Sequence, residues 1–247
     1  MLTVGQILKH IVLQRWLSLR RSESFKLQIA ARIGKGVAVL YLLGVFFYAG
    51  YMLDVFIARI FPKMDSVEIV DRYFMLVLLF MVAIRFFIQK LPAVDMQPYL
   101  NLPFRKSPLV RAWLLLSFIS WWTFLPVAFL LPFWAKTILQ RFAVVAGGYW
   151  LIGVGILVLV TNLVVVLLKV LFFEKPLKFI SLALLLAIAL WADNIFNLHF
   201  VAGLSASLFK QLLSLDTMAL FSLIFLFSLF FYGTSRLVRN RLYLDTV

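Results

Sequence analysis

Long apolar stretches separated by short polar segments dominate this chain. Six of them approach or exceed the roughly 20 residues that a helix needs to cross a bilayer. They lie at about residues 36–57, 73–88, 109–134, 143–173, 179–191 and 218–235, and the fifth is the shortest. A backbone inside the membrane must satisfy its own hydrogen bonds, so we expect an all-α fold, a polytopic bundle of six transmembrane helices.

Two segments outside these stretches have patterns of their own. Within residues 1–35, apolar side chains recur at helical spacing opposite a polar face, at Val4, Ile7, Leu8, Ile11 and Val12. This pattern predicts a helix lying in the membrane interface. The loop from Asp193 to Asp216 is mostly apolar, which favours a re-entrant outer segment before the last helix or a simple interfacial helix. We therefore divide the chain into an interfacial segment at 1–35 and a six-helix transmembrane domain at 36–247.

Composition supports a membrane protein. Hydrophobic residues make up 64% of the 247 positions, charged residues 14%, and the mean hydropathy is +1.04. A typical soluble chain is nearer 45–50% apolar. The absence of cysteine excludes disulfides, thiol catalysis and cysteine-ligated metals.

The net charge of +14 first suggests nucleic acid, but its distribution argues for membrane topology instead. Most of the 24 Lys and Arg residues fall in segments 1–35, 85–111, 169–178 and 236–241. The opposite loops hold only Arg59, Lys63, Lys136, Arg141 and Lys210, with Arg72 at a boundary. By the positive-inside rule both termini are cytoplasmic, as an even number of crossings requires. We expect the lipid bilayer, and no nucleic acid, as the surrounding partner.

Few polar side chains lie within the apolar stretches. Arg85 and Lys169 lie near cytoplasmic ends, so the default expectation is that they snorkel to the interface. Thr161 and Asn162 lie deep in the fourth stretch. We expect Asn162 to hydrogen-bond a neighbouring helix, with a role in a transport pathway as the alternative.

Aromatic and proline residues in the third stretch allow two interpretations. Trp121 and Trp122 lie near its middle and either pack between helices or form one wall of a cavity for an apolar substrate. Pro126 and Pro132 are expected to kink this helix. If a pathway exists, its candidate lining is Trp121, Trp122, Pro126, Thr161 and Asn162.

Signatures of catalysis are missing from the sequence. No G-x-x-x-x-G-K-[ST] phosphate loop is present, and the two histidines, His10 and His199, are predicted on opposite sides of the membrane. No pair of carboxylates is placed for acid–base chemistry. We therefore expect no enzymatic activity, no cofactor and no metal site, and a conduit or scaffold that depends on a partner for energy.

The segment from Gln89 to Pro108 reads QKLPAVDMQPYLNLPFRKSP and is longer than a connection between antiparallel helices needs. It is either a solvated loop whose basic residues reflect only its cytoplasmic position, or a docking surface for a cytoplasmic partner. Its last part continues into the third stretch as LNLPFRKSPLVRAWLLL, from Leu100 to Leu116.

This passage, with the six-span pattern, resembles the permease domains of ABC-type exporters of the type-two superfamily. The resemblance implies a permease-type subunit in a bacterial inner membrane, a separate cytoplasmic ATPase, and a homodimer or a partner permease half. It also implies that the loop after the second helix carries ATPase coupling, here through Asp95, Met96, Gln97, Arg105 and Lys106. The alternative is a non-transporting scaffold or anchor subunit of a larger complex.

More narrowly, RWLSLRRSESFKLQIAARIGKG, RFFIQKLPAVDMQPYLNLPFRKS and RNRLYLDTV resemble an uncharacterised Bacteroidetes family of permease-like membrane proteins. Members of that family continue past the segment similar to RNRLYLDTV. The resemblance implies that this chain is half of a longer protein, a split version or a truncation, and it supplies no substrate-binding residues.

Overall fold

The computed structural model describes residues 25–89, 106–172, 176–195 and 199–244, and within them every regular element is helical. The elements are α2 (Phe25–Tyr51), α3 (Leu53–Ile60), α4 (Ser66–Ile88), α6 (Lys106–Phe118), α7 (Trp121–Phe133), the π-helix η2 (Trp134–Ile138), α8 (Leu139–Arg141), α9 (Val144–Phe172), α10 (Pro176–Ile195), α11 (Phe200–Leu213) and α12 (Thr217–Leu244). The predicted all-α fold is confirmed for these residues.

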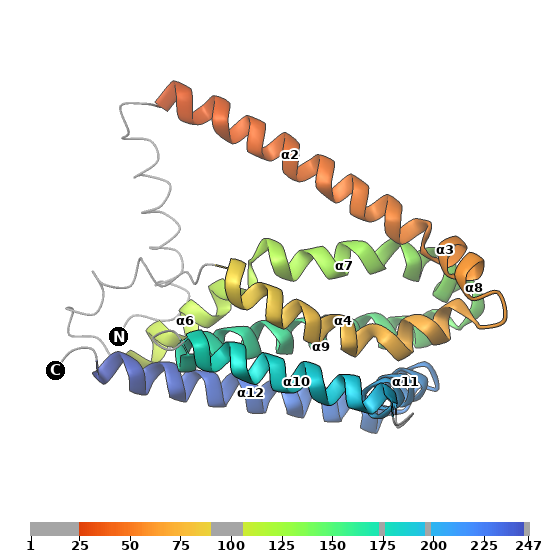
Figure 1. Cartoon of the computed structure of the whole chain (residues 1–247). Helices are drawn as coiled ribbons and strands as arrows, with labels where there is room; N and C mark the ends of the chain where they lie inside the picture. Colours follow the sequence, from red (N-terminus) through yellow and green to blue (C-terminus); the bar gives the residue numbers. More distant parts are fainter. Residues whose placement is uncertain (1–24, 90–105, 173–175, 196–198, 245–247) are drawn as a thin grey trace.

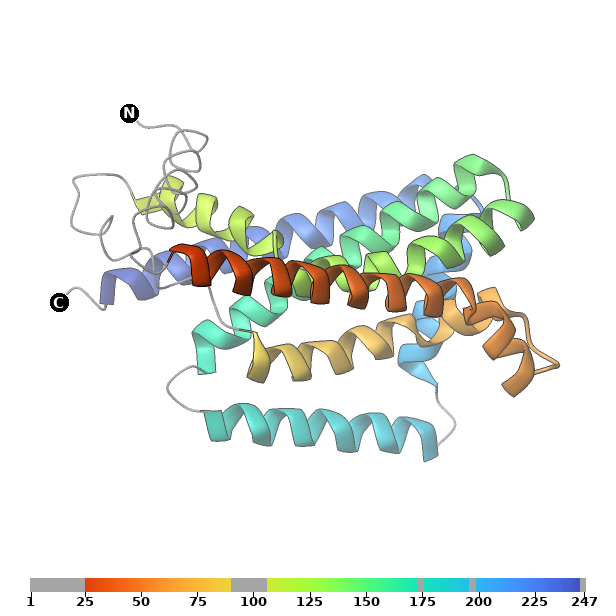
Figure 2. The same ribbon diagram turned by 90° about the horizontal axis from the view of Figure 1, so that it is seen from above.

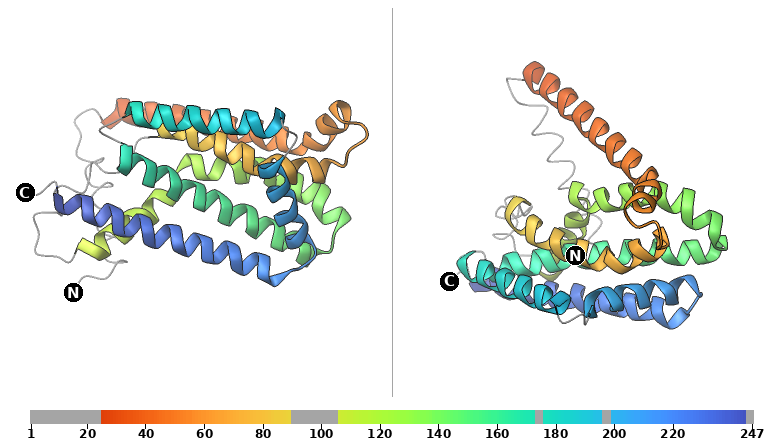
Figure 3. Two further views of the ribbon diagram at one scale, coloured as in Figure 1. Left: turned by 60° about the horizontal axis from the view of Figure 1, so that its bottom comes forward. Right: turned by 45° about the vertical axis from the view of Figure 1, so that its right-hand side comes forward.

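The long helices form a bundle in which successive segments alternate in direction (Figures 1 and 2). Helix α2 begins and α12 ends at the same end of this bundle, where α4 also ends and α6 begins. Helix α11 is shorter and lies across the long helices at the opposite end (Figure 3). Its buried face, formed by Ala202, Ser205, Phe209 and Leu212, packs mainly on α4 and α9.

Three helical segments are long and apolar enough to cross a membrane, namely Trp121–Arg141, Val144–Phe172 and Thr217–Asn240. The pair Gly36–Tyr51 and Leu53–Ile60, bent by 48°, makes a fourth if it counts as one span. The described residues therefore contain three to four crossings by length and composition, fewer than the six expected. Helix α4 differs because charged residues lie toward both of its ends, at Glu68, Asp71, Arg72 and Arg85.

The observed helix boundaries agree best with those expected from the sequence where the sequence is uniformly apolar. The fourth stretch, expected at 143–173, is α9 at Val144–Phe172. The third stretch is divided instead by a break at Ile119 and Ser120, whereas α7 continues through Pro126 and Pro132 and is followed by a π-helix. Helix α10 spans 20 residues, longer than the fifth stretch.

The N-terminal prediction is only partly covered by the structure. Residues 1–24, which contain the expected interfacial helix, lie outside the described residues. Helix α2 begins at Phe25 and continues without a break beyond Gly36. The boundary that we placed between residues 35 and 36 therefore falls inside one helix.

Helix α2 meets the bundle at a backbone contact near its C-terminal end. A Cβ atom added to Gly50 would lie 1.8 Å from the carbonyl oxygen of Phe129 on α7, so no other residue fits without moving one of the helices. From this contact α2 diverges toward its N-terminus (Figure 1). Its apolar side chains there, among them Leu40, Tyr41 and Tyr48, are exposed.

Helix α9 is the centre of the core. Trp150, Val154 and Leu163 on this helix are fully buried. The largest buried cluster joins Trp150 to Phe133 on α7 and Phe209 on α11, with ring centroids 6.5 Å and 5.6 Å from Trp150. This packing fixes the helices on which the buried polar groups lie.

Candidate functional site

The predicted coupling residues fall almost entirely outside the described residues. Asp95, Met96, Gln97 and Arg105 belong to the segment 90–105, and Lys106 is the first residue of α6. The structure does describe both ends to which this segment is attached, Gln89 after α4 and Lys106 at the start of α6.

The five predicted pathway residues lie on two helices. Trp121 and Trp122 are half-buried in the first turn of α7, and Pro126 is buried one turn further on. Thr161 is buried on α9, where its hydroxyl donates to the carbonyl oxygen of Leu157 in its own helix at 2.8 Å. Asn162 takes part in a different group of residues, which joins α9 to α4 and α6.

That group is a buried polar network centred on Asn162. The guanidinium of Arg85 on α4 donates from Nη2 to Asn162 Oδ1 at 2.5 Å. Asn162 Nδ2 donates to Ser117 Oγ on α6 at 3.0 Å, and Ser117 Oγ donates to the carbonyl oxygen of Leu114 at 2.7 Å. We call Arg85, Asn162 and Ser117 the Arg85 network. It confirms that Asn162 hydrogen-bonds neighbouring helices, as expected.

The burial of Arg85 contradicts the expectation that it snorkels to the interface. Arg85 is 1% exposed and Asn162 is 0% exposed. Among the described residues, no carboxylate forms a salt bridge with Arg85. A buried cation is costly unless hydrogen bonds replace its hydration, so the amide of Asn162 acts as its neutral acceptor. The sequence shows that Arg85 lies within the apolar second stretch, but not which face of the helix it occupies.

The network extends to Gln89, the residue that follows α4. Arg85 Nε donates to Gln89 Oε1 at 2.9 Å, and Lys169 Nζ on α9 donates to the carbonyl oxygen of Gln89. Phe86 stacks on Phe179 of α10 beside this cluster, with ring centroids 3.4 Å apart. Two cations therefore contact the residue that immediately precedes the segment 90–105.

The Arg85 network joins the two helices that flank this segment. Arg85 lies in the last turn of α4, Ser117 in the last turn of α6, and Asn162 connects both to the buried core of α9. Hydrogen bonds to a charged group contribute about 1.5–3 kcal/mol each, more than an ordinary contact. Arg85 holds α4 at the end next to segment 90–105, whereas Ser117 holds α6 at its far end, so a displacement of either helix is transmitted to α9.

A second buried polar group lies toward the other end of α4. Asp71 is buried, and its Oδ1 accepts a hydrogen bond from Trp150 Nε1 at 2.7 Å. Ser205 on α11 donates to the carbonyl oxygen of Asp71 and accepts from the amide of Met75 at 3.4 Å. These bonds attach α4 to α9 on one side and to α11 on the other. Sequence reasoning missed Asp71, although it shares the helical face of Val67, Phe74 and Leu78.

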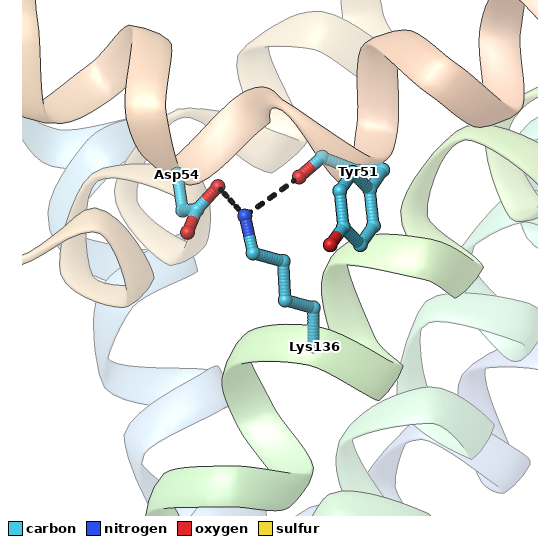
Figure 4. Close-up of polar contacts among 3 residues, drawn as sticks. All are labelled: Tyr51, Asp54 and Lys136. Carbon is cyan, nitrogen blue, oxygen red and sulfur yellow. Dashed lines mark hydrogen bonds and ion pairs between the residues drawn. The ribbon is translucent and has the colours of Figure 1, made fainter.

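A third polar cluster holds the bend between α2 and α3 against η2 (Figure 4). Lys136 Nζ lies 2.9 Å from Asp54 Oδ1 and donates to the carbonyl oxygen of Tyr51 at 3.2 Å. The same ammonium lies 4.4 Å from the centroid of the Tyr51 ring, within the range of a cation–π interaction. Arg141 makes a neighbouring ion pair with Asp65. A π-helix places its side chains out of α-helical register, which turns Lys136 toward α2.

None of these clusters has the composition of a metal site. In the described part of the chain, no three His, Asp or Glu side chains lie close enough together to hold a metal ion. The chemistry available is hydrogen bonding and charge within an apolar bundle. Such groups fix the positions of the helices relative to one another.

Comparisons with known proteins place the chain in a family without assigning a function. No curated protein and no solved structure matches it. A family model, described as a family of unknown function (DUF5687), matches residues 15–247. Because this match covers almost the whole sequence, including all three polar clusters, the chain belongs to the DUF5687 family.

Proposed function

We propose that this chain is the permease-type subunit of an ABC-type exporter, which moves a substrate across the membrane with a separate cytoplasmic ATPase. The observation that carries the proposal is the Arg85 network, because it joins the two helices that flank segment 90–105 to the centre of the bundle. A force applied to that segment would reach α4, α6 and α9 together.

The proposal requires six crossings, formed by α2 with α3, α4, α6 with α7, α9, α10 and α12. At 1.5 Å per residue, the 23 residues of α4 extend about 34 Å and the 20 residues of α10 about 30 Å, enough for a hydrocarbon core of about 30 Å. Asp71 and Arg85 are compatible with a membrane position because both are buried against protein. Both chain ends then lie in the cytoplasm, and α11 is the re-entrant outer helix.

Coupling would proceed through the segment that contains Asp95, Met96, Gln97, Arg105 and Lys106. Closure of the ATPase would push this segment and move the adjoining ends of α4 and α6. The break at Ile119 and Ser120 allows α6 to change its angle to α7 without bending an intact helix. The substrate would pass beside α7 and α9, where Trp121, Trp122, Pro126, Thr161 and Asn162 are the candidate lining.

The complete exporter would contain a second copy of this chain or a partner permease half in a bacterial inner membrane. Helix α12 offers an apolar surface for such an arrangement, because Phe221, Phe225 and Leu229 on it are exposed. The chain itself has no proposed catalytic role and no proposed contact with nucleic acid. Its energy comes from the partner ATPase.

Mild-detergent purification of the chain from its native membrane tests the proposal. We expect a cytoplasmic ATPase to co-purify in stoichiometric amounts, and the double variant R105E/K106E to lose it. The matched control R236E/R239E makes the same charge change on α12 and is expected to retain the ATPase. A stable assembly without an ATPase would instead support the scaffold function, and retention of the ATPase by R105E/K106E would refute the assignment of coupling to these residues.

A further inference from the structure

An apolar groove of about 460 Å³ lies between α2 and α7. It is lined by Leu43, Gly44, Phe47, Tyr48, Tyr51 and Ala128. Its volume falls within the roughly 300–1,000 Å³ typical of small-molecule sites. Along α2 it extends from Leu43 to Tyr51, which corresponds to about 12 Å of helix.

The groove has no covering helix among the described residues. Tyr48 is 64% exposed, and Phe47 and Tyr51 are also exposed. Gly44 leaves the floor open, because a Cβ atom added there would meet no atom within 4 Å. An apolar chain can therefore lie against aromatic rings without displacing any side chain of the protein.

One end of the groove is polar. Tyr51 belongs both to the groove lining and to the cluster in which Lys136 pairs with Asp54 (Figure 4). The side chains of Lys136 and Asp54 are 26% and 25% exposed, so solvent or a ligand can reach them. An ammonium has three N–H donors, and Asp54 and Tyr51 take two of those on Lys136. The third is available to an anionic oxygen.

We propose that this groove binds one acyl chain of a phospholipid, whose phosphate accepts a hydrogen bond from Lys136. A phospholipid supplies both a long apolar chain for the groove and a phosphate for its polar end. The site does not depend on ATP-driven export, since a scaffold could hold the same lipid.

Photolabelling of the purified full chain in lipid nanodiscs tests occupancy of the groove. The probe is phosphatidylethanolamine with a diazirine in one acyl chain, and labelled peptides are identified by mass spectrometry. We expect labelling of the 43–51 peptide to fall about tenfold in G44F, because the added ring fills the groove at Gly44. A tenfold loss corresponds to an acyl chain that buries about two fewer methylenes. The matched control G36F, also at an open position on α2, is expected to label as the native chain does. Equal labelling of G44F and the native chain would overturn the proposal.

A second comparison tests recognition of the phosphate. We expect K136Q to lower labelling about tenfold, the effect of losing one hydrogen bond to a charged group. D54N, which weakens the ion pair but keeps the ammonium, should retain labelling, as should K210Q at another exposed lysine on α11. Diacylglycerol with the same diazirine chain should label weakly. Loss of labelling in D54N, or labelling by diacylglycerol equal to that by the phospholipid, would overturn the role of Lys136. Cross-linking of the groove to a second copy of the chain would overturn the assignment of a lipid as its occupant.

Discussion

Replacing Asn162 with leucine isolates the contribution of the Arg85 network to stability. Leucine has the same branched shape and number of side-chain heavy atoms as asparagine, but it removes the acceptor for Arg85 and the donor to Ser117. Because Asn162 is 0% exposed, water cannot take the place of the lost amide without opening the bundle. The substitution therefore leaves a buried guanidinium short of an acceptor.

The expected loss follows from the two hydrogen bonds. A bond to a charged group contributes about 1.5–3 kcal/mol and a neutral one about 1 kcal/mol, so we expect N162L to lower the free energy of unfolding by about 2–4 kcal/mol. Interhelical hydrogen bonds between neutral groups in membranes often contribute less, about 0.6 kcal/mol on average. Most of the expected loss in N162L therefore comes from the bond to the charged Arg85. Removing the charge as well should recover stability, so R85M/N162L is expected to be more stable than N162L.

The assay is reversible unfolding of the purified chain in bicelles, with the free energy of unfolding measured for each variant. T161V is the matched control, because Thr161 is the buried neighbour whose hydroxyl bonds only its own helix, and its expected cost is below about 1 kcal/mol. A free energy of unfolding for N162L within about 0.5 kcal/mol of the native value would refute the reasoning. So would a loss in R85M/N162L equal to the sum of the losses in R85M and N162L, because residues that bond each other should not be additive.

Two further predictions concern helix contacts away from the network. G50A should lower the free energy of unfolding by about 1–3 kcal/mol, because the added Cβ atom meets the backbone of Phe129 rather than a movable side chain. G44A should change it little, since no atom lies near that position. Equal melting temperatures for the two variants would contradict the contact at Gly50. The hydrogen bond from the Trp150 indole N–H to the Asp71 carboxylate should couple these two side chains. W150F is expected to lower the melting temperature more in the native chain than in a D71A background, where the acceptor is already missing. A double-mutant cycle measures this coupling, and a coupling near zero would contradict the bond.

Much of the architecture could be predicted from hydropathy alone. Helix α9 matches its expected limits within one residue at each end, since its sequence is apolar throughout. The breaks at Met52 and at Ile119–Ser120 could not be predicted, because no glycine or proline lies at either position. At the first break, the contacts of Lys136 with Tyr51 and Asp54 join segments that lie far apart in the sequence.

The buried polar groups were only partly predictable for a similar reason. Asn162 stood out because an amide in the middle of an apolar helix needs a partner. Arg85 lies in the last turn of its helix, where snorkelling and burial give the same sequence pattern. Asp71 lies one turn from the polar start of α4, so its burial depends on the position of Trp150 and α11, which sequence alone does not fix.

Single-cysteine labelling tests most directly the central claim that the chain crosses the membrane six times, with segment 90–105 on the same side as both ends. The natural absence of cysteine makes each introduced thiol the only one in the chain. With an impermeant maleimide on intact cells, we expect K63C, Q140C and S214C to be labelled, and Q97C, K175C and T246C to be labelled only after permeabilisation. Labelling of Q97C in intact cells would contradict the account, because no cytoplasmic ATPase could then reach the proposed coupling segment.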